Sequence, residues 1–179
     1  ERTESQGLFS MVSPELRDKI KRFRKKVDAD RTLVGHLIVK LILNQYFQFD
    51  RQYIDYCYNQ FGKPGIKDSS GQFHFNISHS GDWVVGVVAK DRIGIDIERI
   101  GTLRREVYSI ALTAEEIVDL KSLGESEERA RFYDLWTIKE SYVKAIGRGL
   151  NESLSKLEVL LDGEVVSLEK DKQVLPVFF

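Results

Sequence analysis

The stretch "FHFNISHSGDWVVGVVAKDRIGIDIERI", residues 73–100, decides the fold because its hydrophobic residues change to a period of two. Apolar and polar side chains alternate in residues 73–77 and 93–100, and residues 83–89 form an apolar run. Both patterns are typical of short β-strands. The tripeptides "SGD" and "KDR" between these runs are typical of turns. We therefore predict three consecutive strands that form an antiparallel meander.

Two helices are predicted upstream of these strands. Ser13 and Pro14 are an N-cap and a proline at the first helical position, and they open a helix that runs to about residue 27. Asp28 or Asp30 then caps a second helix. Apolar residues recur in this helix at helical spacing, which predicts a stripe that faces the core. The stripe comprises Leu33, Val34, Leu37, Ile38, Leu41 and Ile42.

Helices and then strands are also predicted downstream. Thr113 and Glu116 have the spacing of a capping box for a short helix. The charged stretch "GESEERA", residues 124–130, separates that helix from a longer amphipathic helix, which stops at Gly147. The stretch "LEVLLDGEVVSLE", residues 157–169, predicts a hairpin with the Asp-Gly pair in its turn.

The order of helices, strands, helices and strands favours an α+β fold over a parallel α/β sheet. We expect two pseudo-symmetric halves, each a small antiparallel sheet packed with helices. The N-terminal half is predicted at residues 1–90 and the C-terminal half at residues 91–179.

The composition limits the classes of partner. The chain has 179 residues, 42% of them hydrophobic, so it can bury the core of one or two compact units. Its 27 basic and 28 acidic residues give a net charge of -1, which favours neither nucleic acid nor an anionic membrane. We therefore expect neither as a partner, and any anion site must be local.

Other features indicate the compartment. The one cysteine, Cys57, excludes an internal disulfide, suits a reducing compartment and is expected to be a small buried residue. No apolar run approaches the ~20 residues of a membrane span, and the first residues do not resemble a signal peptide, so we expect a cytoplasmic protein. The chain begins without methionine and ends on the apolar "VLPVFF", so we expect its ends to be incomplete.

An acidic pair lies on the third predicted strand. Strand alternation sends Gly94, Asp96 and Glu98 to one face, so two carboxylates project side by side about 7 Å apart at their Cα atoms. Such a pair needs a compensating cation, and Mg²⁺ is one candidate. The alternative is a solvated strand face on which Arg92 and Arg99 supply the opposite charge. The pair by itself favours the second interpretation.

The stretch "FYDLWTIKESYVKAIGRGL", residues 132–150, places Glu140 and Lys144 one helical turn apart. By themselves they indicate only a favourable surface ion pair. The stretch "KIKRFRKK", residues 19–26, holds six basic residues and indicates a solvated helix face or a nucleic-acid patch.

The motifs gain meaning in combination. The chain contains G-I-D-I-E, then about 40 residues later W-T-I-K-E-S-Y-V-K, and then G-R-G-L. This combination resembles the 4′-phosphopantetheinyl transferases, in particular the longer two-half group typified by the surfactin synthetase activator. The resemblance covers nearly the whole chain, because "SPELRDKIKRF", "DADRTLVGHLIVK", "GKP" and "FNISHSGDW" match family segments in the expected order.

The resemblance implies a catalytic centre. Asp96, Glu98 and Glu140 match the metal-binding carboxylates, which implies Mg²⁺ as the cofactor. Glu140, directly or through a metal-bound water, is also the candidate base, and Lys139 precedes it as the motif requires. Lys144 matches the lysine that contacts a phosphate of coenzyme A, and it would neutralise the leaving phosphate.

The resemblance also implies contacts to coenzyme A, the co-substrate. Residues that would approach the 3′-phosphate are Lys19, Arg31 and Thr32, although the family representative has a further lysine where this chain has Leu16. Ser78 and His79 look like the phosphate-contacting pair. Lys63 and Pro64 look like the loop that contacts the adenine.

The implied reaction transfers the 4′-phosphopantetheine group of coenzyme A to a serine of an apo peptidyl or acyl carrier protein, with release of 3′,5′-ADP. The carrier is expected to dock near the stretch "TLRREVYSIAL", residues 102–112, and the protein is expected to be a monomer. Two alternatives remain open. One is a Mg²⁺-dependent nuclease or nucleotide hydrolase, and the other is a non-catalytic adaptor that binds coenzyme A or a carrier protein.

Overall fold

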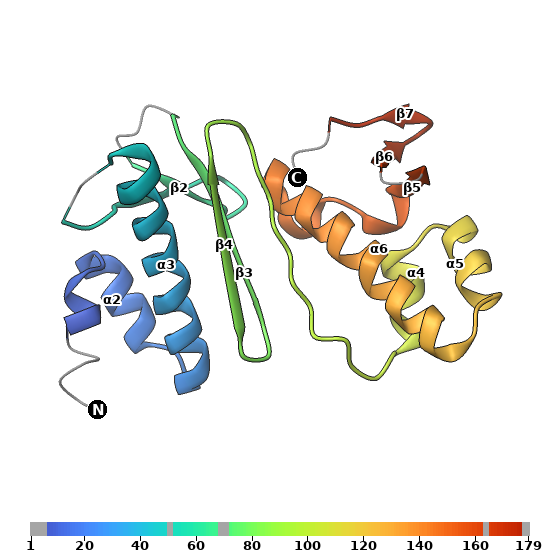
Figure 1. The fold of residues 1–179 in the computed structure, drawn as a ribbon, viewed down its shortest axis with the longest axis horizontal. Coiled ribbons are helices and arrows are strands. Elements are labelled where there is room, and N and C mark those ends of the chain that lie inside the picture. The colour runs from blue at the N-terminus through green and yellow to red at the C-terminus, as the bar shows by residue number, and fades with distance from the viewer. Residues whose placement is uncertain (1–6, 50–51, 68–71, 163–164, 177–179) are drawn as a thin grey trace.

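The computed structural model describes residues 7–49, 52–67, 72–162 and 165–176. The order of elements is helices, strands, helices and strands, which confirms the α+β class, and Figure 1 shows small sheets packed with helices. The two-fold relation between halves and the division at residue 90 remain predictions. Within the described ranges, no helix is both long and apolar enough to cross a membrane.

The first part of the chain packs two helices against two hairpins (Figure 1). The helices are α2 (Pro14–Lys21) and α3 (Lys26–Phe47). The strands are β1 (Tyr56–Tyr58), β2 (Pro64–Ile66), β3 (His74–Ser80) and β4 (Trp83–Ala89), which pair as β1–β2 and β3–β4.

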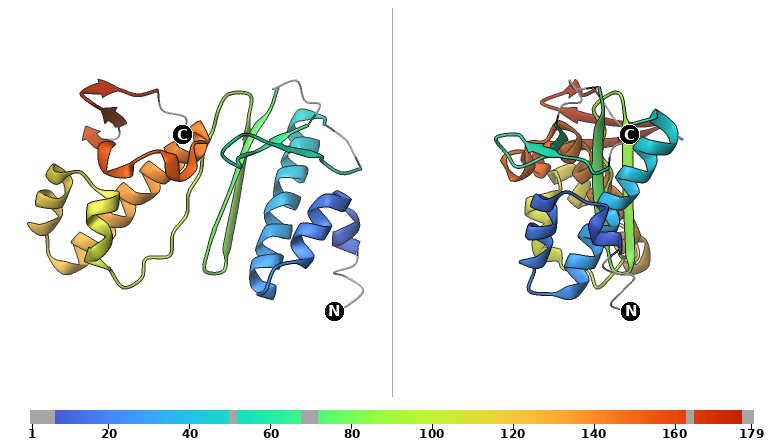
Figure 2. Two further views of the ribbon diagram at one scale, coloured as in Figure 1. Left: turned by 180° about the vertical axis from the view of Figure 1, so that it is seen from behind. Right: turned by 90° about the vertical axis from the view of Figure 1, so that its left-hand side faces the viewer.

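The second part surrounds one long helix with short helices and a three-stranded sheet (Figure 2). The α-helices are α4 (Tyr108–Ala111), α5 (Ala114–Lys121) and α6 (Glu125–Ile146). The 3₁₀ turns are η1 (Arg105–Val107), η2 (Gly149–Asn151) and η3 (Leu154–Lys156). The sheet has the antiparallel order β5 (Glu158–Asp162), β6 (Val165–Lys170) and β7 (Gln173–Val174).

Helix α2 begins as predicted, but its end differs from the prediction. The hydroxyl of Ser13 accepts a hydrogen bond from the Leu16 amide at 3.3 Å. The helix ends at Lys21, and α3 starts at Lys26 without a side-chain cap, so the predicted cap by Asp28 or Asp30 is wrong. Asp28 lies instead in the first turn of α3, where a carboxylate is stabilised by the helix dipole.

The apolar stripe of α3 is only partly core. Leu33 is buried, whereas Val34 is 41% exposed and Leu41 is 63% exposed. The reason is the contact with the β3–β4 hairpin, which centres on Gly35. A Cβ atom at Gly35 would lie only 2.5 Å from the Cγ2 atom of Ile77, so the absence of a side chain allows close approach and turns part of the stripe outward.

The predicted meander is wrong in its third strand. Strands β3 and β4 form the predicted hairpin around a turn at Gly81, whose φ is 58°. Residues 93–99 form no strand and run parallel to β3, between the hairpin and α6 (Figure 1). Their amides bond to side chains of β3, so the segment joins β3 without a backbone ladder.

The predicted capping box and the predicted helix end in the second part are confirmed, but the predicted boundary between helices at residues 124–130 is wrong. Thr113 and Glu116 form the predicted capping box of α5, and Gly147 ends α6 with a φ of 69°. Residues 124–130 do not separate two helices, because residues 125–130 form the first turns of α6. Glu128 is buried there and accepts hydrogen bonds from Arg105 and Tyr108.

The C-terminal hairpin is confirmed by the pairing of β5 with β6, although Gly163 of its turn lies outside the described residues. Cys57 is exposed rather than buried. The largest core cluster lies around α6 and includes Phe132, Leu135 and Tyr142, as the amphipathic pattern predicted.

Candidate active site

The site forms where residues 93–99 pass along α6. Gly94 makes this contact possible, because a Cβ atom there would lie 1.9 Å from the carbonyl oxygen of Ser141 and 2.7 Å from the amide nitrogen of Ala145. The extended segment therefore packs directly on the backbone of α6. This contact places Asp96, two residues along the segment, close to the helix face that carries Lys144.

Asp96 and Lys144 form an ion pair at the centre of the site. The Asp96 side chain is only 3% exposed, and its Oδ1 atom also accepts a hydrogen bond from the Ser78 hydroxyl at 2.8 Å. Lys144 Nζ donates to the same hydroxyl at 3.0 Å. The Oδ2 atom of Asp96 is buried and has no hydrogen-bond partner among the described residues. A buried carboxylate oxygen without a partner is costly unless another ligand satisfies it.

Two further carboxylates lie near this pair. The Oε2 atom of Glu98 accepts a hydrogen bond from the Ser80 hydroxyl at 2.9 Å. Burial raises the pKa of Glu140, and the charges of Asp96 and Glu98 raise it further against the opposing effect of Lys144. The charges of Asp96 and Glu98 therefore oppose ionisation of Glu140, which is a repulsion that a shared cation would relieve.

The donor set suits Mg²⁺, although the ligands are not already gathered around one point. Among the described residues, no three His, Cys, Asp or Glu side chains have an arrangement that could hold a metal ion. Lys144 supplies the positive charge next to Asp96 instead. The unused Oδ2 atom of Asp96 and the carboxylates of Glu98 and Glu140 are hard oxygen donors, which are the ligands that Mg²⁺ prefers.

An open cavity of about 530 Å³ adjoins Glu98. Ser80, Ile97 and Arg99 also line it, and so does Trp83, which is 71% exposed at the start of β4. The carboxylate of Glu98 is therefore open to solvent through this cavity.

The rotation of α6 is held by a buried ion pair on its other side. Lys139 is fully buried and pairs with Glu116, and it also donates to the Ala111 carbonyl oxygen at 2.9 Å. The other carboxylate oxygen of Glu116 accepts a hydrogen bond from the Val159 amide at 3.0 Å. Because Lys139 directly precedes Glu140, this network fixes the face on which Glu140 lies.

The predicted adenine loop touches the end of α6. Lys63 Nζ donates to the Ala145 carbonyl oxygen at 2.7 Å, and burial lowers its pKa to about 8. The Asn59 side chain donates to the Gly147 carbonyl oxygen at 2.9 Å. Both bonds satisfy carbonyl groups that the helix end leaves free. Pro64 begins β2 beside them and is half-buried.

The other predicted nucleotide contacts are distributed over α2, α3 and β3. Lys19 is exposed, with Nζ 5.4 Å from the centre of the Tyr58 ring, and it lines a different cavity of about 570 Å³. Arg31 donates to the Gly81 carbonyl oxygen in the β3–β4 turn. The Thr32 hydroxyl donates to a carbonyl oxygen of its own helix at 2.8 Å. His79 is exposed, whereas its neighbour Ser78 is buried.

Comparison with known proteins assigns the family. Residues 92–174 match the family described as the 4′-phosphopantetheinyl transferase superfamily. Residues 1–91 match the family described as 4′-phosphopantetheinyl transferase, N-terminal. The chain belongs to the 4′-phosphopantetheinyl transferase superfamily.

Curated relatives match most of the length of this chain. It is 38% identical to 4′-phosphopantetheinyl transferase ffp of Bacillus subtilis over 98% of this chain and 78% of the relative. It is also 38% identical to 4′-phosphopantetheinyl transferase Sfp of Bacillus subtilis (strain 168), over 90% of this chain and 73% of the relative. The human L-aminoadipate-semialdehyde dehydrogenase-phosphopantetheinyl transferase is 32% identical over 82% of this chain and 52% of the relative.

Three polar side chains make contacts that the sequence motifs do not predict. Asn76 and Ser80 bond the extended segment, and Asn59 bonds the end of α6. For the first two a signal existed, because the polar residues in "NISHS" occur at every second position and share one face of a strand.

Proposed function

We propose that this chain transfers the 4′-phosphopantetheine group of coenzyme A to a serine of an apo peptidyl or acyl carrier protein and releases 3′,5′-ADP. The observation that carries the proposal is the meeting of Asp96, Lys144 and Ser78 beside Glu98 and Glu140, in a chain whose relatives are named 4′-phosphopantetheinyl transferases. One site thus offers oxygen ligands for a metal, an acidic group near the metal and a cation for a phosphate.

The three carboxylates of Asp96, Glu98 and Glu140 would hold Mg²⁺, which neutralises charge on the pyrophosphate when bound. Lys144 moves from Asp96 to a phosphate oxygen of coenzyme A in this scheme. Phosphoryl transfer depends mainly on positioning and charge neutralisation, and both are tasks that these side chains can perform.

The reaction forms one bond and breaks another at the β-phosphorus of coenzyme A. The oxygen of the carrier serine attacks this phosphorus, and the bond to the bridging oxygen breaks, so that the electron pair leaves with 3′,5′-ADP. Glu140, directly or through a water molecule, accepts the serine proton. Lys144 neutralises the leaving phosphate and is the candidate proton donor to it.

The remaining contacts belong to the nucleotide. Residues proposed to bind it are Lys19, Arg31, Thr32, Lys63, Pro64, Ser78 and His79. The proposal includes a division of labour in which residues 1–90 contact the nucleotide and residues 91–179 carry the catalytic helix. It also includes a monomer located in the cytoplasm.

The test is the intact mass of an apo carrier protein after incubation with the chain, coenzyme A and Mg²⁺, with and without a chelator. A chelator-sensitive gain of one phosphopantetheine supports the proposal. No gain on peptidyl and acyl carriers, with coenzyme A still bound, indicates the adaptor. Consumption of coenzyme A or other nucleotides without any carrier indicates the hydrolase.

Glu140→Gln tests the assigned base. General-base catalysis contributes roughly 10²- to 10⁴-fold, so the variant is expected to lose at least about 100-fold in turnover with its fold intact. Glu127→Gln is the matched control, because Glu127 is exposed on the same helix. Turnover of Glu140→Gln at the wild-type rate would contradict the assignment.

A further inference from the structure

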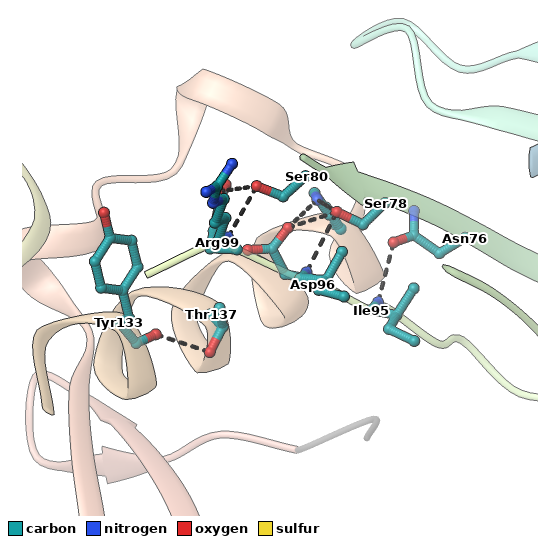
Figure 3. A network of polar contacts seen from close by, with 11 residues as sticks. Asn76, Ser78, Ser80, Ile95, Asp96, Arg99, Tyr133 and Thr137 are labelled. Atoms are coloured by element: carbon teal, nitrogen blue, oxygen red, sulfur yellow. Dashed lines mark hydrogen bonds and ion pairs between the residues drawn. The ribbon is translucent and has the colours of Figure 1, made fainter. Parts of the chain in front are cut away.

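A repeating set of hydrogen bonds joins β3 to the segment that carries two of the metal-binding candidates. The side chain of Asn76 accepts from the Ile95 amide at 3.0 Å, and the Ser80 hydroxyl accepts from the Arg99 amide at 2.9 Å. Between them, the Ser78 hydroxyl accepts from the Ile97 amide at 3.4 Å. Figure 3 shows Asn76, Ser78 and Ser80 pointing from β3 toward this segment.

The repeat has a constant offset. Each β3 side chain binds the amide nineteen residues later, so the two segments advance together by two residues per bond. Side chains at every second position of a strand share one face, and the same period governs the extended segment. A shift by one residue would turn Asp96 and Glu98 to the opposite face. The three bonds therefore fix the register in which both carboxylates face the site.

The two serines also hold the carboxylates themselves. The Ser78 hydroxyl donates to Asp96 at 2.8 Å, and the Ser80 hydroxyl donates to Glu98 at 2.9 Å. A hydroxyl has one donor hydrogen and two acceptor lone pairs. In Ser78, the donor binds Asp96 and the acceptors receive Ile97 and Lys144, so its hydrogen-bonding capacity is already filled.

The position without a carboxylate has a different task. Each serine binds the carboxylate eighteen residues later, and the residue eighteen after Asn76 is Gly94, which has no side chain and packs on the backbone of α6. The first bond of the repeat therefore docks the segment on α6, and the other two orient Asp96 and Glu98. Asp96 meets Lys144 because both contacts belong to one register.

We propose that Ser78 and Ser80 are positioning residues that orient the metal-binding carboxylates Asp96 and Glu98. The inference deepens the proposed function and rests on it for the use of a divalent metal. Hydrogen-bonded partners of ligating carboxylates fix ligand orientation, and their removal typically costs 10- to 100-fold in metal affinity.

The decisive measurement is Mn²⁺ binding to the chain without coenzyme A, followed by electron paramagnetic resonance. Ser80→Ala is expected to raise the Kd for Mn²⁺ by about 10-fold or more, and Ser80→Thr, which keeps the hydroxyl, is expected to restore it to within about threefold of wild type. Ser122→Ala is the control, because that exposed hydroxyl bonds only a carbonyl oxygen of its own helix end. Urea unfolding of each variant verifies that the protein measured is folded.

Kinetics give a second readout. Ser80→Ala is expected to raise the Mg²⁺ concentration for half-maximal rate by about 10-fold, while kcat at saturating Mg²⁺ and KM for coenzyme A change by less than about threefold. For Ser78→Ala, the Kd for Mn²⁺ measured without coenzyme A is also expected to rise by about 10-fold or more. Unchanged Mn²⁺ binding in Ser78→Ala would overturn its positioning role.

The outcomes separate this inference from the proposed function. Unchanged Mn²⁺ affinity in Ser80→Ala, or no Mn²⁺ binding by the wild-type chain, overturns the inference even if transfer to a carrier occurs. Weakened Mn²⁺ binding in Ser80→Ala with rescue by Ser80→Thr supports it even if no carrier is modified, because that measurement needs no turnover.

Discussion

Gly94→Ala tests whether the close packing of the extended segment on α6 builds the site. The added Cβ atom would lie 1.9 Å from the Ser141 carbonyl oxygen, whereas real Cβ atoms essentially never lie within 3.0 Å of such a neighbour. The neighbour is helix backbone, which cannot swing aside as a flexible side chain does. The segment must therefore move by about 1 Å, away from Lys144.

The expected cost lies at the upper end of the range for overpacking, about 3 kcal/mol in the free energy of unfolding. This corresponds to roughly a 150-fold change in the folding equilibrium. Transfer is also expected to fall, because a displacement of about 1 Å at a catalytic group can cost about 100-fold in rate. Urea unfolding followed by circular dichroism gives the first quantity, and the carrier mass assay gives the second.

Gly101→Ala is the matched control, two residues beyond the same extended segment. The nearest atoms to a Cβ there are the Tyr133 hydroxyl at 3.5 Å and the Arg99 carbonyl oxygen at 3.8 Å, which are ordinary contacts. Neither glycine has a positive φ, so the two substitutions differ in steric contact rather than in backbone strain. If Gly94→Ala unfolds within about 0.5 kcal/mol of Gly101→Ala and transfers at the wild-type rate, the packing argument is refuted.

Three further substitutions test other parts of the structure. Burial lowers the pKa of His36 to about 4, so the folded chain disfavours protonation of this side chain at pH values where the unfolded chain, with a pKa of about 6.5, accepts the proton. The stability that the neutral side chain contributes is therefore lost as the pH falls from 6.5 toward 4, by up to about 3 kcal/mol. Urea titrations at several pH values should show that loss in wild type and in His79→Phe but not in His36→Phe. Glu116→Ala leaves the buried ammonium of α6 without its partner and is expected to cost about 3–5 kcal/mol, against less than about 0.5 kcal/mol for the exposed Glu115→Ala; equal melting of the two would exclude a structural role for the pair. Lys63→Met removes the bond to the end of α6 and is expected to cost about 1–2 kcal/mol in chemical denaturation, and a variant as stable as wild type would show that this bond contributes nothing.

Local features of the chain were readable from the sequence. The β3–β4 hairpin follows from alternation on both sides of Gly81, and the caps at Ser13, Thr113 and Gly147 follow from interactions within one helical turn. These features depend on neighbours a few residues away, so a single sequence contains the information that specifies them. The family motifs likewise group the three carboxylates with Lys144.

Other features depend on contacts with residues that are distant in the sequence. The exposure of Leu41 follows from the face that α3 packs on β3 and β4, and α3 starts at Lys26 without a side-chain cap that the sequence could reveal. Alternation in residues 93–100 predicted an extended chain, but alternation is the same for a ladder strand and for a segment held by side chains.

The sequence by itself therefore determined the class of fold, the helix limits set by local caps and the main hairpin, and its family motifs predicted which residues form the candidate site. Only the tertiary structure decided that residues 93–99 run parallel to β3 and are bonded by its side chains. It also decided that Gly94 meets α6 and that Lys144 reaches Asp96 across 48 residues of sequence. Such contacts join distant segments, and their geometry follows from the packing of whole elements rather than from the conformational preference of any one stretch.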